Sequence, residues 1–273
     1  TRELCAEGVK LSDIAARYGT PTYVYSRAAI TSSYHAYTEA LEGCAHRVCF
    51  AVKANSNLAV LNVLARLGAG FDIVSVGELE RVLAAGGKPD GIVFSGVGKR
   101  EDEIVRALEI GIHCFNVESR AELQRIQTVA AQLNKVAPIS LRVNPDVDAN
   151  THPYISTGLR ENKFGIDMIE ALDVYREAST LSHIKIKGID CHIGSQLTEL
   201  TPFLDALEKV LALIDQLAAE NIVVEHLDLG GGLGVSYRSG DQPPTPGDYM
   251  KAVRAHLGDR KLKLLVEPGR SIV

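Results

Sequence analysis

The strongest constraint on the fold is a regular alternation of short apolar runs with amphipathic helical segments. Eight runs have the length and composition of buried strands, at residues 47–53, 70–75, 91–95, 112–117, 138–144, 184–192, 224–229 and 262–267. Segments of helical periodicity lie between them, at 57–68, 77–86, 100–110, 119–134, 167–180, 200–220 and 247–258. This alternation predicts an α/β fold with a parallel sheet, and the count of eight favours a closed (β/α)8, TIM-like barrel. An open doubly wound sheet is the alternative.

Local signals mark the ends of several expected helices. Ser119 and Glu122 have the spacing of a capping box, and Pro202 falls in the first turn of its helix. Glycines stand where C-terminal caps belong, at Gly68, Gly86 and Gly111. A further helical segment at 27–43 precedes the first strand, and it could fill the position in the outer ring that follows the eighth strand.

Composition excludes several classes of protein. The chain has 273 residues, with 29 Lys and Arg against 34 Asp and Glu, and this net charge of −5 disfavours a nucleic-acid partner. No apolar run approaches the roughly 18 residues of a membrane span, so no membrane partner is expected. The five cysteines form no CxxC pair, which predicts buried, reduced thiols and no metal site. The expected location is the cytoplasm, or the plastid stroma for a plant chain.

A lysine at the end of the first strand is the leading candidate for chemistry. Lys53 follows the apolar run 48–52, which belongs in a sheet buried on both faces. Partial burial would lower the pKa of this amine and leave it free to attack carbonyl carbons, as a Schiff-base lysine does. A lysine that only extends to solvent from a strand end is the alternative.

Polar residues gather at the carboxyl ends of the other expected strands, where a barrel carries its active site. Each has a structural alternative: Asp72 as a helix N-cap, His192 as a core histidine, Glu267 as half of an ion pair. Their convergence on one rim favours a functional site. The other polar or glycine residues expected on this rim are Ser75, Glu78, Arg142, Asn144, Gly194, Ser195 and Arg270. Two longer loops, 144–165 and 230–246, follow strands on the same side, and loops of this length are usually functional.

A glycine-rich segment indicates an anion site. Gly230, Gly231 and Gly232 would let backbone N–H groups approach a ligand, and a tight turn is the alternative. The spacing is not that of a dinucleotide or Walker A loop. A phosphate site, an aldehyde-reactive lysine and an inward carboxylate together fit pyridoxal 5'-phosphate, with Glu267 beside the pyridine nitrogen and His192 on the ring face.

Seven motifs in order carry a resemblance to a known family. They are TPTYVY (20–25), FAVKAN (50–55), FDIVSVGEL (71–79), RVNP (142–145), CHIGSQ (191–196), DLGGGLG (228–234) and EPGR (267–270). With them, residues 18–273 resemble the fold-type III pyridoxal-phosphate decarboxylases, which join an alanine-racemase-like barrel to a β-domain. HPYISTG (152–158) and NKFG (162–165) are similar to the diaminopimelate branch rather than to ornithine decarboxylases.

The resemblance implies roles for individual residues. Lys53 would bind the cofactor covalently and His192 would stack on its ring, and these two are the expected catalytic residues. Glu267 would bind the pyridine nitrogen, and Asp72 and Arg142 would lie near the ring. The phosphate would be held by Ser195, Gly230, Gly231, Gly232, Gly269 and Arg270. Arg270 also matches the arginine that binds a substrate carboxylate.

The resemblance also implies the domain organisation and the assembly. Residues 1–26 would form a segment or strand belonging with the β-domain, and 27–273 the cofactor-binding barrel. The C-terminal β-domain itself is absent from this chain. In the family that domain supplies a cysteine proton donor, reached partly across a homodimer interface, so none of the five cysteines here receives that role. A polypeptide ending at Val273 would lack normal decarboxylase activity.

The activity that the resemblance implies is decarboxylation of meso-2,6-diaminopimelate to L-lysine and CO₂, the last step of lysine biosynthesis. Two alternatives stay open. One is the same chemistry on ornithine, arginine, D-lysine or carboxynorspermidine. The other is a non-catalytic pyridoxal-phosphate carrier or regulator.

Overall fold

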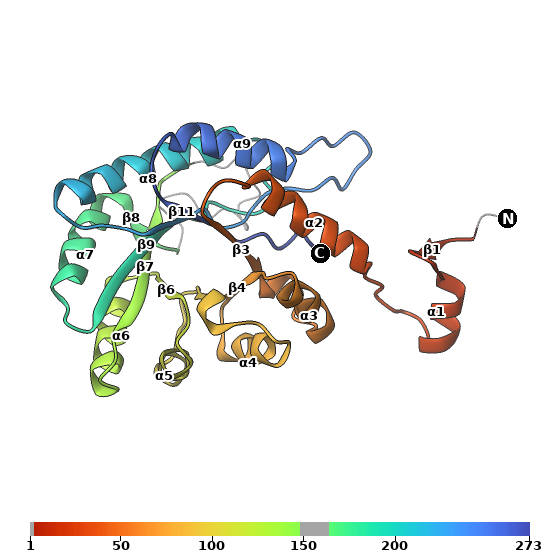
Figure 1. Ribbon diagram of the computed structural model, residues 1–273, viewed down its shortest axis with the longest axis horizontal. Coiled ribbons are helices and arrows are strands. Elements are labelled where there is room, and N and C mark those ends of the chain that lie inside the picture. The colour runs from red at the N-terminus through yellow and green to blue at the C-terminus, as the bar shows by residue number, and fades with distance from the viewer. Residues whose placement is uncertain (1–2, 148–163) are drawn as a thin grey trace.

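The protein is built around a closed parallel barrel (Figure 1). The computed structural model describes residues 3–147 and 164–273. Around the ring, each strand pairs in parallel with the next, and the last pairs with the first. The order is β3 (His46–Ala51), β4 (Gly70–Ile73), β5 (Ile92–Phe94), β6 (Cys114–Val117), β7 (Ala137–Asn144), β9 (Ile184–Asp190), β10 (His226–Asp228) and β11 (Lys263–Val266). The (β/α)8 prediction is therefore confirmed, and the open sheet is excluded.

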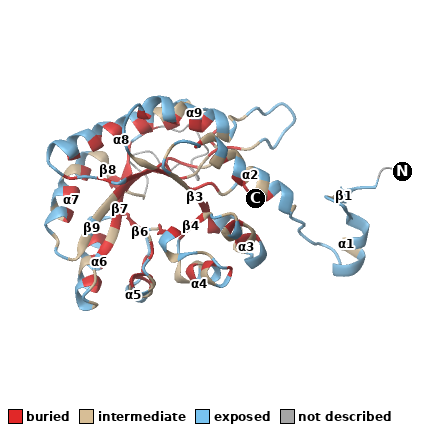
Figure 2. Ribbon diagram, viewed as in Figure 1, coloured by how far each residue is buried: buried red, intermediate tan, exposed pale blue. Residues whose placement is uncertain are grey.

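Helices cover the outside of the ring (Figure 1). They are α3 (Leu58–Arg66), α4 (Val76–Ala84), α5 (Glu101–Ile110), α6 (Arg120–Gln132), α7 (Met168–Thr180), α8 (Thr201–Ala219) and α9 (Pro246–Leu257). Helix α2 (Arg27–Ala40) packs against α9, α3 and β3, so it fills the eighth position as predicted. The buried face of each helix points to the strands and the exposed face to solvent (Figure 2), because one apolar stripe per helix covers the sheet.

The predicted helix ends are largely as observed, with one difference. Gly68, Gly86 and Gly111 all have positive φ at the ends of their helices, and Pro202 lies in the first turn of α8. Ser119 caps α6 by accepting from the Glu122 N–H at 3.2 Å. The Glu122 carboxylate does not return the bond to Ser119: it accepts from the backbone of Glu118 and from buried Lys99, at 3.2 and 2.7 Å. An ion pair with Lys99 therefore replaces half of the expected capping box.

The N-terminal segment lies apart from the barrel (Figure 1). It holds a two-stranded antiparallel ribbon, β1 (Cys5–Ala6) with β2 (Val9–Lys10), followed by α1 (Leu11–Tyr18). No residue of α1 is buried, and Tyr23 is 90% exposed. The assignment of residues 1–26 to a β-domain stays a prediction.

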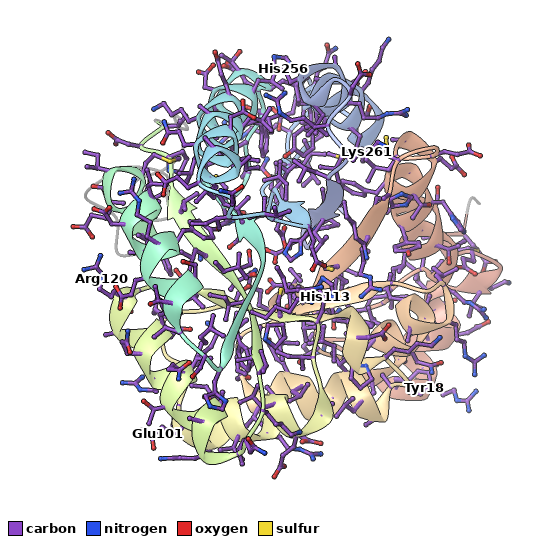
Figure 3. All side chains as sticks on the ribbon, turned by 60° about the vertical axis from the view of Figure 1, so that its left-hand side comes forward. Tyr18, Glu101, His113, Arg120, His256 and Lys261 are labelled. Atoms are coloured by element: carbon purple, nitrogen blue, oxygen red, sulfur yellow. The ribbon has the colours of Figure 1, made fainter. Side chains whose placement is uncertain are left out.

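Side chains fill the barrel, which is a packed core and not a pore. Figure 3 shows side chains throughout the ring, with His113, which precedes β6, near the centre of the view. Inside the ring lies a small apolar cluster of Cys49, Val93, Cys114 and Leu265, whereas the main apolar core lies between strands and helices. All five cysteines are free thiols, and three are buried; Cys5 is exposed and Cys44 half-buried. The prediction of buried thiols is thus wrong for these two.

Two further observations concern predicted segments. Of the loop expected at 144–165, residues 148–163 lie outside the described part of the chain; a short strand, β8 (Ile166–Asp167), then pairs with the end of β7. The 230–246 segment connects β10 to α9 and contributes to the cavity described below. Among the described residues, no helix is both long and apolar enough to span a bilayer.

Candidate active site

A cavity of about 420 Å³ opens at the carboxyl end of the barrel. Its walls come from the segments that follow β3, β9, β10 and β11. Predicted site residues in its lining are Lys53, His192, Ser195, Gly231, Gly232, Glu267, Gly269 and Arg270. Asp72, Arg142 and Gly230 are buried and do not line the cavity. The structure therefore brings the predicted residues together on one rim.

Lys53 reaches the cavity from a short 3-10 turn, Val52–Ala54, directly after β3. Its Nζ lies 2.8 Å from Oδ2 of Asp72 on the neighbouring strand β4. The side chain of Lys53 is 53% exposed, whereas that of Asp72 is fully buried. Burial lowers the pKa of Lys53, but the charges of Asp72 and Glu267 raise it by more, so the net pKa lies above its usual value. The predicted lowering of this pKa is therefore wrong.

His192 follows β9 and is held in one orientation. Its Nδ1 accepts a hydrogen bond from the Gly231 N–H at 3.2 Å, so a neutral ring carries its proton on Nε2. Burial, followed by the positive charges of Arg142 and Lys53, holds the pKa of His192 well below its ordinary value. The ring therefore stays neutral at physiological pH, and it lines the cavity as a flat apolar surface.

Glu267 stands directly after β11 and is 5% exposed. Asn116 of β6 donates to its Oε1 at 3.3 Å. Burial, and then the nearby Asp228 and Asp72 carboxyls, raise the pKa of Glu267 well above its usual range. A positively charged group placed against Glu267 would favour its ionised form.

Arg142 of β7 is a buried cation behind the cavity. It pairs with Glu118 at 2.8 Å and lies 4.0 Å from Asp190. It also donates to the His192 backbone carbonyl at 3.5 Å. Through this contact it supports the segment that carries His192. The structure thus connects Arg142 with the site indirectly.

A guanidinium and two hydroxyl groups form the other end of the cavity. Arg270 donates to the Ser195 Oγ at 3.2 Å and to the hydroxyl of Tyr237. The Arg270 Cζ lies 5.6 Å from the Tyr237 ring centroid, within cation–π distance. These groups suit an anion such as a phosphate or a carboxylate.

The glycine segment is closely packed, which differs from the open backbone that the sequence suggested. A Cβ on Gly231 would lie 2.3 Å from the Glu267 carbonyl oxygen, and one on Gly232 would lie 2.5 Å from that of Gly194. The amides of Gly230 and Gly231 already donate, to Asp228 and to His192. These glycines are therefore required for contact between loops, and their part in holding a phosphate stays a prediction.

Gly231→Ala should destabilise the full-length protein by about 1–3 kcal/mol, the usual cost of forcing an extra methyl into a packed site. The added methyl would push the segments after β10 and β11 apart at the Glu267 carbonyl. Gly247→Ala is the matched control, because, apart from its chain neighbours and the backbone of its own helix, its Cβ would come no closer than 3.5 Å to another atom. Urea unfolding of both variants measures the difference. Equal stability of the two would contradict the packing role.

Several residues of the site were missed by sequence reasoning. Tyr237 lies in a loop that only its length marked as functional, so no signal identified this residue. Asn116 and Glu118 occupy the end of β6 and the position after it, and Asp190 and Asp228 end β9 and β10. A polar residue closing an apolar run was the available signal for all four. Sequence reasoning applied this signal at other strand-end positions but not at these four.

The donor set fits pyridoxal phosphate. A cavity of this size suits a small cofactor. The cavity lining includes the amine of Lys53, the buried carboxyl of Glu267 and the neutral imidazole of His192. The guanidinium of Arg270 and the hydroxyl of Ser195 lie at its other end. Asp72 Oδ1 is buried and has no hydrogen-bond partner among the described residues, which leaves an acceptor beside the lysine.

A barrel with this donor set defines a pyridoxal-phosphate-binding domain. The chain belongs to the pyridoxal-dependent decarboxylases, since the model of their pyridoxal binding domain matches residues 27–273. The resemblance seen in the sequence motifs is thereby confirmed, and so is the expected cofactor, pyridoxal phosphate.

Relatives place the chain more narrowly within this family. It is 68% identical over 271 residues to the diaminopimelate decarboxylase of Pseudomonas aeruginosa, and 61% identical to that of Vibrio cholerae. Each alignment covers 99% of this chain and 65% of the relative. The chain therefore spans about 65% of the length of these relatives.

Solved structures agree with the fold. The crystal structure of diaminopimelate decarboxylase from Helicobacter pylori complexed with L-lysine is 44% identical, with a TM-score of 0.94 over 97% of this chain and 67% of that chain. A lysine/ornithine decarboxylase from Vibrio vulnificus, at 24% identity and a TM-score of 0.80 over 96% of this chain and 66% of that one, shares the fold alone.

Proposed function

We propose that the full-length protein removes CO₂ from meso-2,6-diaminopimelate to give L-lysine, the last step of lysine biosynthesis. The observation that carries this proposal is the cavity, which joins Lys53 and Glu267 at one end to the Arg270 guanidinium at the other. The names of the relatives, at up to 68% identity, support the substrate.

The residues of this chain would prepare the reaction as follows. When bound, pyridoxal phosphate supplies an aldehyde and an electron-withdrawing ring that stabilises negative charge on the substrate's α-carbon. Asp72 holds the Lys53 ammonium at 2.8 Å, which fixes the amine on the cavity wall and gives its proton an acceptor. Glu267 would present its buried carboxyl to the ring nitrogen, and neutral His192 would pack against the ring without adding charge.

Arg270 would orient the substrate or the cofactor phosphate. Ser195 and Tyr237 hold its guanidinium at the cavity wall, so its fork is directed before any ligand arrives. A planar guanidinium binds a carboxylate through two parallel hydrogen bonds. Ser195, Gly230, Gly231, Gly232 and Gly269 remain the proposed phosphate contacts.

The proposal extends to assembly and location. The substrate is a small amino acid, and we expect a homodimer in which a second chain completes the active site. The proton donor would come from the part of the protein beyond this chain. Residues 1–26 would pack with that part, which would give a partner to the exposed Tyr23. We expect the protein to act in the cytoplasm.

Release of CO₂ by the full-length gene product with pyridoxal phosphate tests the proposal. We expect strong preference for meso-diaminopimelate over L-ornithine and D-lysine. Preference for either of the other amino acids would keep the chemistry and reassign the substrate. Cofactor binding without CO₂ release from any of the three would favour the carrier or regulator.

A further inference from the structure

The carboxyl end of the barrel contains more buried acids than cations. Among the described residues, five of the buried carboxyl groups stand at or next to strand ends, and two cations lie among these five, Lys53 and Arg142. The acids are Asp72, Glu118, Asp190, Asp228 and Glu267. Lys53 pairs with Asp72, and Arg142 pairs with Glu118 at 2.8 Å. The other three acids have no cation of their own at hydrogen-bond distance among the described residues.

These three acids form a tight cluster. Asp190, Asp228 and Glu267 each offer a carboxylate oxygen within 4.8 Å of the others. Three charges this close and this buried would repel strongly, because little water screens them. Carboxyls in such a group share protons instead of ionising together.

Two unpaired oxygens mark positions that a proton would stabilise. Asp228 Oδ1 accepts from the Gly230 N–H at 2.9 Å, while its Oδ2 is buried without a hydrogen-bond partner in the described part of the chain. Asp190 has the same pattern: its Oδ2 faces Arg142 at 4.0 Å and its Oδ1 is unpaired. A buried carboxylate oxygen without a partner is costly, and a proton on it removes most of that cost.

We propose that Asp228 and Glu267 share one proton in a hydrogen bond, and that Asp228 Oδ2 holds this proton and donates it when a cationic ring nitrogen faces Glu267. Asp228 is then a positioning residue, because this hydrogen bond fixes the Glu267 carboxyl. When a cationic ring nitrogen faces Glu267, Glu267 is the ionised member of the pair and Asp228 is the neutral one. Its other oxygen holds Gly230 and with it the glycine segment. This inference rests on the proposed role of Glu267, but its test does not depend on the substrate.

The surroundings of Asp228 agree with a neutral acid. Burial raises the pKa of Asp228 to about 7, against hydrogen bonds with Gly230 and Glu267 that act to lower it. Burial and the charge of Asp228 also raise the pKa of Asp190. The charged and titratable groups facing this cluster are Asp72, Glu118, Lys53, Arg142, Cys49, Cys114, Cys191 and Tyr249. Negative or neutral groups outnumber the two cations.

Infrared spectroscopy of the full-length holoprotein tests the proton directly. At about pH 6 ordinary carboxyls are ionised, so the carbonyl stretch of a protonated acid reports only groups with raised pKa. A band that shifts on ¹³C-aspartate labelling is expected, and Asp228→Asn should remove part of it. Asp259→Asn, at an exposed acid, should leave the band intact. An unaltered band in Asp228→Asn would overturn the proposal.

The pH dependence of unfolding gives a second readout. Asp228 has a folded pKa of about 7, above the unfolded value of about 3.9. The unfolded chain therefore releases this proton first, and wild-type stability should fall relative to Asp228→Asn as the pH rises from about 4 to about 7. If Asp228 were ionised in the fold and only capped Gly230, the difference in stability between the two proteins would stay flat between about pH 4 and 7, and that result would overturn the proposal.

Cofactor affinity shows the consequence for Glu267. Asp228→Asn keeps an acceptor for Gly230 and a donor for Glu267, whereas Asp228→Ala keeps neither. We expect the alanine variant to bind pyridoxal phosphate about ten- to a hundredfold more weakly, as for loss of a hydrogen bond to a charged group, and the asparagine variant to restore most of the affinity. Equal losses in both variants would contradict the donor role. If the alanine variant does not fold, the infrared band and the unfolding slope decide.

Discussion

Replacement of Lys53 by alanine should abolish covalent cofactor binding and lower turnover of the full-length enzyme by about 10⁴-fold or more, the scale seen when a nucleophile is removed. Lys53 is the amine that lines the cavity beside buried Asp72. Without it, nothing at that position can bond to the cofactor aldehyde. The visible absorption of the holoprotein and CO₂ release measure the two effects.

Two controls separate chemistry from folding in this experiment. Lys53→Arg keeps a cation opposite Asp72, so its stability should stay close to wild type while its covalent binding is lost. Lys251→Ala removes an exposed lysine and should retain activity. Turnover in Lys53→Ala within tenfold of wild type would contradict the role of Lys53.

Glu267→Gln should lower kcat by about 10²–10³-fold, the scale for removing one preorganised electrostatic contact. The amide keeps the shape and the contact with Asn116, but it cannot ionise opposite a protonated ring nitrogen. The ring would then withdraw less charge from the substrate. Because Lys53 and Arg270 are untouched, the variant should still bind cofactor.

Steady-state kinetics with an absorption spectrum of bound cofactor checks this prediction. Glu109→Gln, at an exposed acid, serves as the control for removing one carboxylate. A Glu267→Gln enzyme with cofactor bound and kcat near wild type would show that Glu267 does not act on the ring.

The barrel was predictable because its signal is periodic. Each apolar run and each helical segment corresponds to an observed element, and their number favoured a ring over an open sheet. Boundaries were less accurate: Lys53 was placed in a strand but lies in a 3-10 turn after β3. That turn directs the lysine into the cavity, and only the local backbone shows it.

The electrostatics of the site could not be predicted from single residues. The pKa of Lys53 depends on Asp72, which is separated from it in sequence but comes close because Ala51 pairs with Asp72 between β3 and β4. The role of Gly231, which follows β10, depends on the backbone carbonyl of Glu267, which follows β11. Sequence reasoning found strand-end residues with unusual polarity but did not find which of them touch.

Borohydride reduction of the full-length holoprotein, followed by peptide mass mapping, tests the central claim most directly. Reduction makes the bond between a lysine and the cofactor permanent, so the labelled residue can be read from the peptide masses. The predicted result is a pyridoxyl group on Lys53 and on no other lysine. A label on a different lysine, or none on protein that holds the cofactor, would contradict the assignment of this cavity as the active site.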